Sequence, residues 1–533
     1  MKGKKWVILL LSATLLVLLS QNVVGTLCSF VDSETATGNT FGAWTSSLWT
    51  QTTQGDFNAG VLNNVDTSSS PGDIKIAVRS DWYNVGWSFR KQITIAHTNV
   101  AADLTNFPVL INFTSDADIA SAAQSNGNDI LFTSANGTTK LDHEIEWYVG
   151  GTGQLVAWVR VPTLSSVTDT AIFLYYGNSS CINQQNPAGV WNSSFKSVWH
   201  MSETSGTTIK DSTSNNNNGT PNGGVTLNAT GKIDGGDSFN GTDGYTSLGT
   251  SSSLNFAANV PFTIEGWYKT TESYGPIFSF RHDTNDGAVI DICVGYDGAV
   301  GSAGRLMGLV RQDSGSGGYA RVTGPTVNDG NWHYFVLTRN AGNTIQLFSD
   351  GVLQGTSSGS ASGGAITTNI RALGSERRWV QVSYGTADQR YLVGTTDEVR
   401  VSNVQRSSSW ISTCYNNQVS PSTFFSLAAK EGYYVSSGTV ASQVLDTGVA
   451  GTRWDAVFWD KTLPASTGIT FEVRASADSF APGDAIISWT PVGGTSPVLS
   501  GLPSGRYMQW RATLTTSNTA NTPTLDEARV YYH

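Results

Sequence analysis

The sequence predicts an all-β protein made of several β-sandwich domains, and three observations lead to this fold class. The chain has 533 residues, whereas one hydrophobic core stops growing at about 250–300 residues, so several domains are expected. Charged residues make up 14% of the chain, well under the ~25% of an ordinary soluble domain, which gives little support for long solvent-facing helices. Aromatic residues, Ser, Thr, Asn and Gly replace them, and this mixture suits short strands joined by tight turns.

The N-terminus predicts export. Three lysines among the first five residues precede a mostly apolar run at residues 6–20, which is the pattern of a secretory signal peptide occupying residues 1–25. The alternative is an uncleaved membrane anchor, because residues 6–24 are just long enough to cross a bilayer. We therefore expect an extracellular or cell-surface location.

Net charge and cysteine use exclude two kinds of site. A formal net charge of −10 and a pI of about 5.1 leave no basic stripe for nucleic acid. The cysteines form no Cys-x-x-Cys pair and no paired histidines accompany them, so a zinc site is not expected. Export permits disulfides, but the sequence does not choose among three pairings and free thiols. The four cysteines are Cys28, Cys181, Cys293 and Cys414.

Residues 26–49 are expected to form an N-terminal arm. Residues 29–43 read SFVDSETATGNTFGA, and this stretch resembles the mature N-terminus of the TasA/camelysin group of matrix-fibre proteins. The resemblance implies export and self-assembly through the arm. Residues 44–49 carry two Trp and a Leu, which would let the arm add as a strand to a neighbour's open sheet. The alternatives are that the arm packs on its own chain or stays a flexible tether.

Residues 80–195 are predicted to form a β-sandwich of unknown function. Five strand candidates, each bounded by Gly, Pro, Asn or Asp turns, have the spacing of a sandwich. They are residues 87–95, 107–111, 129–132, 155–161 and 171–176. The phrases WSFR, NFPV, WVRVP and YYGN, which begin at Trp87, Asn106, Trp158 and Tyr175, resemble a family of unknown function that recurs beside laminin-G-like modules in prokaryotic surface proteins. That family has no assigned activity, so none is implied here.

Residues 196–428 are predicted to form a jelly roll. The matching phrases are VWHMSE at 198–203, FNGTDGY at 239–245, FTIEGW at 262–267, WHYFV at 332–336, FSDGV at 348–352 and TDEVRV at 396–401. In this order and spacing they resemble a concanavalin-A-like, laminin-G/pentraxin jelly roll. Read as strands, they predict a tight hairpin turn at Ser349–Gly351 and two antiparallel sheets packed face to face.

Residues 50–78 and 431–533 are predicted to fold together as a split β-sandwich domain. In the stretch from Tyr507, alternation places Met508, Trp510, Ala512 and Leu514 on one face. Residues 50–78 resemble the opening strands of the same unit, so the two middle domains become an insertion. Insertion at a loop costs little when the guest's ends lie close together. The alternative is that residues 50–78 are an independent linker.

Enzymatic activity is not expected. The jelly-roll phrases lack the paired carboxylates of a glycosidase, and Gly-x-Ser-x-Gly and His-Glu-x-x-His are absent from the chain. The densest acidic cluster is Asp142 to Glu146. Strand alternation places His143 and Ile145 on one face and Glu144 and Glu146 on the other. An ordinary solvated strand edge explains this cluster.

Calcium is the expected cofactor, and sugar the expected small ligand. The laminin-G-like resemblance implies a calcium site built from Asp side chains and backbone carbonyls at the rim of the jelly roll, with Asp243 and Asp397 as metal ligands. The alternative role for Asp397 is to cap a turn by accepting backbone N–H groups. Sugar binding needs an aromatic platform beside polar side chains, and Trp379 with Tyr384 are the expected binding residues.

Three functions therefore stay open. The leading one is an exported binding or adhesion protein that recognises glycan or protein through a lectin-like jelly roll. The second is a structural subunit of a surface fibre or envelope layer. The third is a polysaccharide-active enzyme. The expected partners are an extracellular glycan, a surface protein or further copies of the same chain, and nucleic acid is not among them.

Overall fold

The structure is a computed structural model that describes residues 46–533 except 284–286, 297–298, 314–317, 359–361, 377–389 and 494. Strands account for 48% of the chain and helices for 8%, which confirms the all-β prediction. The predicted signal peptide and Cys28 lie outside the described residues. Across the ranges that the structure describes, no helix is long and apolar enough to cross a membrane. The chain divides into two compact units, one ending at Ser80 and resuming at Gly432, the other running from Asp81 to Glu431.

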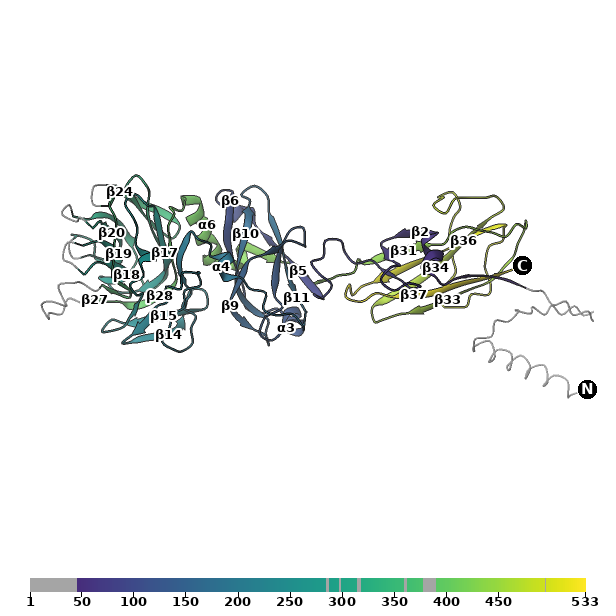
Figure 1. Cartoon of the computed structure of the whole chain (residues 1–533), viewed down its shortest axis with the longest axis horizontal. Helices are drawn as coiled ribbons and strands as arrows, with labels where there is room; N and C mark the ends of the chain where they lie inside the picture. Colours follow the sequence, from purple (N-terminus) through teal and green to yellow (C-terminus); the bar gives the residue numbers. More distant parts are fainter. Residues whose placement is uncertain are drawn as a thin grey trace, which may run out of the picture. The chain divides into compact units, whose positions relative to one another are not determined.

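The first unit is a sandwich of two sheets that the chain enters twice (Figure 1). One sheet has the order β1-β37-β4-β3, with β33 also paired to β37, and the other has the order β2-β31-β36-β34-β35, with β32 also paired to β36. The early strands are β1 (Ser47–Gln51), β2 (Val61–Asn63), β3 (Val65–Asp66) and β4 (Ile74–Ile76). The late strands are β31 (Ser437–Ala441), β32 (Leu445–Asp446), β33 (Trp454–Thr462), β34 (Thr467–Ser476), β35 (Thr490–Pro491), β36 (Tyr507–Thr516) and β37 (Thr524–Tyr532).

The core of this sandwich follows the alternation in the sequence. Met508, Trp510, Ala512 and Leu514 of β36 are all fully buried between the sheets, which confirms the predicted inner face. The ends at which the chain leaves and re-enters the unit lie side by side. Val78 and Tyr434 form an antiparallel bridge, so a short connection would close this gap.

The N-terminal arm ends earlier than predicted. Strand β1 pairs with β37 from Ser47 opposite Tyr532 to Gln51 opposite Ala528, and Trp49 packs against the core of its own unit. Residues 47–49 therefore belong to the chain's own sheet and not to a free arm, because Trp49 buries its ring there and β1 satisfies its backbone groups on β37. Residues 26–45 lie outside the described part.

The second unit begins with a sandwich of two sheets. A three-stranded sheet has the order β6-β10-β9 and faces a sheet with the order β29-β5-β11-β7-β8. The strands of the first sheet are β6 (Leu104–Phe113), β9 (His143–Val149) and β10 (Gln154–Leu164). Those of the second are β5 (Phe89–Ile95), β7 (Leu131–Ser134), β8 (Lys140–Leu141), β11 (Thr170–Tyr176) and β29 (Phe425–Leu427). We call this the host sandwich.

The end of the predicted jelly-roll range belongs to the host sandwich. Helix α6 (Ser408–Val419) buries Trp410, Ile411 and Cys414 in a core that the host sandwich shares with the inner edge of the jelly roll, and the Asn417 amide bonds both the N–H and the carbonyl of Leu110. After the short helix α7 (Pro421–Phe424), β29 pairs with β5. The predicted boundary at residue 428 is therefore corrected: the chain returns to the host sandwich from about residue 408, because the apolar side of α6 and β29 find partners there.

The jelly roll consists of an eight-stranded sheet, β14-β15-β28-β17-β22-β23-β24 with β12 paired to β28, and a seven-stranded sheet, β13-β16-β25-β18-β19-β20-β21. The first contains β12 (Phe195–Trp199), β14 (Val225–Thr230), β15 (Gly235–Asn240), β17 (Phe262–Thr270), β22 (Trp332–Arg339), β23 (Thr344–Ser349), β24 (Val352–Ser358) and β28 (Val393–Ser402). The second contains β13 (Thr220–Asn222), β16 (Tyr245–Ser247), β18 (Gly275–Arg281), β19 (Val289–Val294), β20 (Arg305–Arg311), β21 (Ala320–Thr326) and β25 (Ile370–Leu373). Between β23 and β24, Asp350 and Gly351 both have positive φ, which is the geometry of the predicted hairpin turn.

Candidate functional site

Strand β9 places two glutamates on one face of the host sandwich. Side chains alternate along a strand, so Glu144 and Glu146 point to the same side, as the sequence predicts. The prediction that this side is a solvated edge is wrong, because the two side chains are only 7% and 1% exposed. The jelly roll covers them: His200, which follows strand β12, reaches both carboxylates.

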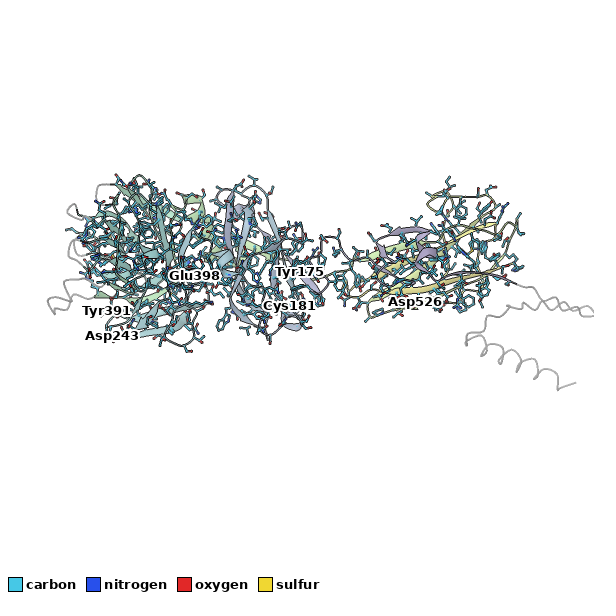
Figure 2. All side chains as sticks on the ribbon, in the orientation of Figure 1. Tyr175, Cys181, Asp243, Tyr391, Glu398 and Asp526 are labelled. Atoms are coloured by element: carbon cyan, nitrogen blue, oxygen red, sulfur yellow. The ribbon has the colours of Figure 1, made fainter. Side chains whose placement is uncertain are left out.

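His200 is the centre of a buried polar cluster where the jelly roll meets the host sandwich. Its Nδ1 lies 2.6 Å from Oε1 of Glu398 and 3.3 Å from Oε2 of Glu146, and its Nε2 lies 3.3 Å from Oε2 of Glu144. Figure 2 shows Glu398 on the side of the jelly roll that faces the host sandwich. We call Glu144, Glu146, His200, Glu398 and Arg400 the junction cluster.

Tryptophans from the host sandwich line the junction cluster and donate to it. The indole N–H of Trp158 donates to Glu146 over 2.7 Å, and that of Trp191 donates to Glu144. Arg400 donates to Glu398 and places its guanidinium 4.1 Å from the ring centre of Trp158. Each charged group thus has polar partners, and His200 links carboxylates of both sandwiches, which is how buried charges are tolerated.

The pKa values of these groups diverge because of their neighbours. Burial raises the pKa of Glu144 and of Glu398, but the charge of His200 and the hydrogen bonds that both carboxylates accept, joined at Glu398 by the charge of Arg400, together outweigh burial, and both pKa values are lowered. Burial would lower the pKa of His200, yet Glu398, Glu146 and Glu144 raise it well above its ordinary value. Glu146 takes the opposite direction: burial and the nearby Glu398 raise its pKa well above the usual range. His200 and Glu398 thus favour their charged forms in each other's presence, whereas Glu146 favours its neutral form.

This arrangement fixes the jelly roll on the host sandwich. A polysaccharide must touch a catalytic carboxylate directly, and no side chain among the three glutamates is more than 7% exposed. The chemistry available at this position is ion pairing, hydrogen bonding and the binding of a small cation.

Asp397 and Asp243 are not brought together. In the ladder between β15 and β28, Asn240 lies opposite Val393, and Asp397 is four residues further along β28, or roughly 13 Å at ~3.3 Å per residue. Asp243 lies beyond Asn240 in the opposite direction, in an exposed turn. Figure 2 shows the Asp243 label beside Tyr391 and away from Glu398. A calcium site shared by Asp243 and Asp397 does not fit this register.

Asp397 alone fits a cation ligand. Its Oδ2 accepts the backbone N–H groups of Lys232 and Ile233, which is the turn-capping role that the sequence offered as an alternative. Its Oδ1 is buried and receives no hydrogen bond from the described residues. Burial and the nearby Glu398 raise the pKa of Asp397 well above its ordinary value. Asp243 differs because it is exposed, and its Oδ1 accepts from the Gly224 N–H and the Asn240 amide.

The outer face of the seven-stranded sheet carries a second group of interest. Leu306 and Val310 of β20 lie in the jelly-roll interior, so alternation places Met307 and Leu309 on the other side of the sheet, where they are fully buried in a separate apolar cluster. Two tyrosines from the adjoining loops pack on this cluster, with ring centres 6.0 Å apart. We call Tyr296, Met307, Leu309, Arg311 and Tyr319 the outer-face patch.

Arginines hold and border the outer-face patch. The Arg311 guanidinium lies 4.9 Å from the ring centre of Tyr319, within the range of a cation–π contact. Beside it, Arg281 forms buried ion pairs with Asp291 and Glu376, and Ser279 donates to Asp291 over 2.8 Å. The patch therefore combines aromatic rings with fixed polar groups on one sheet face.

The predicted sugar-binding residues Trp379 and Tyr384 lie outside the described residues. Sequence reasoning missed His200 and Glu398 as a pair. The sequence contained a clue to this pair, because the jelly-roll phrases at 198–203 and 396–401 contain His200 and Glu398. The strands of these two phrases are neighbours, with Val198 opposite Arg400. For Tyr296 and Tyr319 we find no such signal, since each sits in a Gly-rich turn that predicts only a loop.

Two family profiles match parts of the chain. Residues 240–412 match the concanavalin A-like lectin/glucanases superfamily, and residues 126–217 match a domain of unknown function, DUF2341. The chain thus contains a laminin-G-like, concanavalin-A-like domain and a DUF2341 domain. The second match runs from the host sandwich into the jelly roll, so it includes Glu144, Glu146 and His200. A search of curated proteins finds no match.

Solved structures resemble parts of the chain at low identity. Domain 4 of AbnA, a GH43 extracellular arabinanase from Geobacillus stearothermophilus, is 18% identical, with 41% of this chain and 96% of that chain covered and a TM-score of 0.31. The CBM40 of the IT-sialidase from Ruminococcus gnavus is 18% identical, with 30% and 84% covered and a TM-score of 0.25. A SAP-like pentraxin from Limulus polyphemus is 17% identical, with 30% and 72% covered and a TM-score of 0.24. TM-scores this low carry no argument about the ligand.

Proposed function

We propose that this protein is exported and binds glycan at the outer-face patch of its jelly roll. The observation that carries the proposal is the pair Tyr296 and Tyr319, held beside Arg311 on one sheet face. The profile match to a lectin and glucanase superfamily supports a sugar ligand for this fold. Export rests on the basic and apolar N-terminus.

The chemistry of the patch suits a sugar ring. The apolar face of a pyranose packs on an aromatic side chain, while its hydroxyl groups need donors and acceptors at the rim. Tyr319 supplies the ring, and Arg311 places its guanidinium beside that ring, held by the contact with Tyr319 and by the hydrogen bond from its Nε to the carbonyl of Gly287. The buried ion pairs of Arg281 keep the neighbouring strands in register beneath it.

Binding without cleavage is part of the proposal. The densest group of carboxylates in the described residues is the junction cluster, and its side chains are buried and committed to His200, Arg400 and two indoles. A glycosidase needs two accessible carboxyl groups at a fixed separation. The carboxyl groups of the junction cluster are buried, so a polysaccharide has no access to them.

A glycan array with the full chain and its Tyr319→Ala variant tests the proposal. We expect the wild-type chain to bind one class of glycan and the variant to bind it roughly tenfold more weakly, since loss of a stacked ring costs about 1–1.5 kcal/mol. The matched control is Tyr507→Ala, which removes a tyrosine under another arginine, Arg506, in the other unit. If no glycan is retained, or if both variants bind as the wild type does, the outer-face patch is not the binding surface.

A further inference from the structure

The junction cluster contains more buried acceptors than donors. Oε1 of Glu146 is buried and receives no hydrogen bond from the described residues, and the same is true of Oδ2 of Asp234. A buried carboxyl oxygen without a hydrogen-bond donor is tolerated only where a proton or a cation supplies the missing partner.

Carboxyl groups outnumber permanently charged cations around His200. The junction cluster and Asp234 bring four carboxyl groups, and among the described residues Arg400 forms an ion pair with one of them, Glu398. Protonation of His200 adds one charge at most. A bound divalent cation supplies two positive charges but requires the neutral imidazole, so it offsets as much carboxylate charge as a protonated imidazole with one further proton does.

The donor atoms already have the spacing of a metal site. Nδ1 of His200 and one carboxylate oxygen each from Glu146 and Glu398 lie within 4.8 Å of one another. Ligands bound at ~2.0–2.2 Å in a tetrahedral site stand roughly 3.5 Å apart, so small side-chain shifts would close the set around one ion. Nε2 of His200 faces Glu144 at 3.3 Å, and a carboxylate on the far nitrogen is what orients a metal-binding histidine.

We propose that His200, Glu146 and Glu398 bind one divalent transition-metal ion of the zinc class, with Glu144 as the residue that positions the imidazole. An imidazole nitrogen among carboxylates favours such an ion over calcium, which takes oxygen ligands. Glu146 comes from the host sandwich, and His200 and Glu398 come from the jelly roll. The ion therefore ties the two sandwiches together, and the site is distinct from the one that Asp397 would offer to calcium.

Isothermal titration of the metal-stripped full chain with Zn²⁺ tests this site. We expect one Zn²⁺ per chain, at least 100-fold weaker binding in Glu146→Gln, and about 10–100-fold weaker binding in Glu144→Gln, which removes only the orienting group. The control is His333→Ala. His333 contacts Asp329 and Asp350 at 3.1 and 2.8 Å near the surface of the same jelly roll, and its loss should leave the tight site intact.

A spectroscopic measurement on the wild-type chain covers the case in which Glu146→Gln does not fold. The Co²⁺-loaded chain should show ligand-field bands and an X-ray absorption spectrum with one imidazole nitrogen and carboxylate oxygens at about 2.0–2.2 Å. Absence of tight Zn²⁺ binding, or tight binding that a folded Glu146→Gln keeps, would overturn the proposal. In the first case protons, and not a metal, satisfy the spare carboxyl oxygens of Glu146 and Asp234.

Discussion

At the scale of single residues, burial decides what an acidic side chain does. Alternation along β9 correctly puts Glu144 and Glu146 on one face. The sequence does not say what covers that face, because the covering residue, His200, belongs to the next domain. The same limit applies to Asp243 and Asp397. The sequence phrases that contain these aspartates lie at neighbouring strands, but the sequence does not give the register that separates them. It also does not show that Asp243 is exposed and Asp397 is buried.

Asp397 should stabilise the jelly roll more than Asp243 does. Asp397→Ala leaves two backbone N–H groups without their acceptor, which costs about 1–3 kcal/mol. Asp243→Ala is the matched control and should cost under about 0.5 kcal/mol, as exposed substitutions usually do. Calorimetric melting of the full chain with and without a calcium chelator measures both. If the chelator leaves the wild-type melting temperature unchanged, Asp397 acts as a turn cap alone.

At the scale of elements, local sequence patterns predict where strands and turns occur better than they predict which strands pair. The hairpin at Ser349–Gly351 is confirmed because Asp-Gly favours two successive positive φ angles at any such site. Helix α6 and strand β29 were not recognised. Strand β29 has only three residues, and it pairs with β5, which lies more than three hundred residues earlier. Such a pairing leaves no trace in the local sequence.

The segment that returns to the host sandwich, from about residue 408 to the end of β29 at Leu427, should be essential to the stability of that sandwich. Phe424 is fully buried in the host core, next to β29. Phe424→Ala should therefore destabilise that sandwich by about 3–5 kcal/mol, the cost of a large cavity. Ser426→Ala, at an exposed position in β29, is the control and should change stability by less than about 0.5 kcal/mol. Urea unfolding of the full chain measures both. Equal effects of the two substitutions would show that this segment contributes little.

At the scale of the whole molecule, the chain is arranged as nested insertions. The first unit is interrupted between Val78 and Tyr434, the host sandwich is interrupted between its strands β11 and β29, and the jelly roll lies innermost. At the innermost boundary, the N–H of Asn403 donates to the carbonyl of Ser194 over 2.9 Å, so the guest's ends are adjacent. Closely placed ends make each insertion inexpensive.

The nested arrangement makes a deletion test specific. Residues 46–78 joined to 432–533 through a short Gly/Ser linker should fold cooperatively, because the bridged ends need little chain to connect them. Residues 431–533 alone should be unstable, since β37 and β31 lose their pairing with β1 and β2 and expose sheet edges. Circular dichroism melting compares the two. Equal stability of the two proteins would contradict the split domain and favour an independent linker.

The central claim is that this chain binds glycan without cleaving it, and one paired measurement tests it most directly. The glycan that the array selects is incubated with the full chain, and retention of the polymer and release of reducing ends are followed in the same sample. The account predicts saturable retention that falls in Tyr319→Ala, and no release above a protein-free control. Release of reducing ends that disappears when a carboxylate is substituted would contradict it, because the chain would then be a polysaccharide-active enzyme.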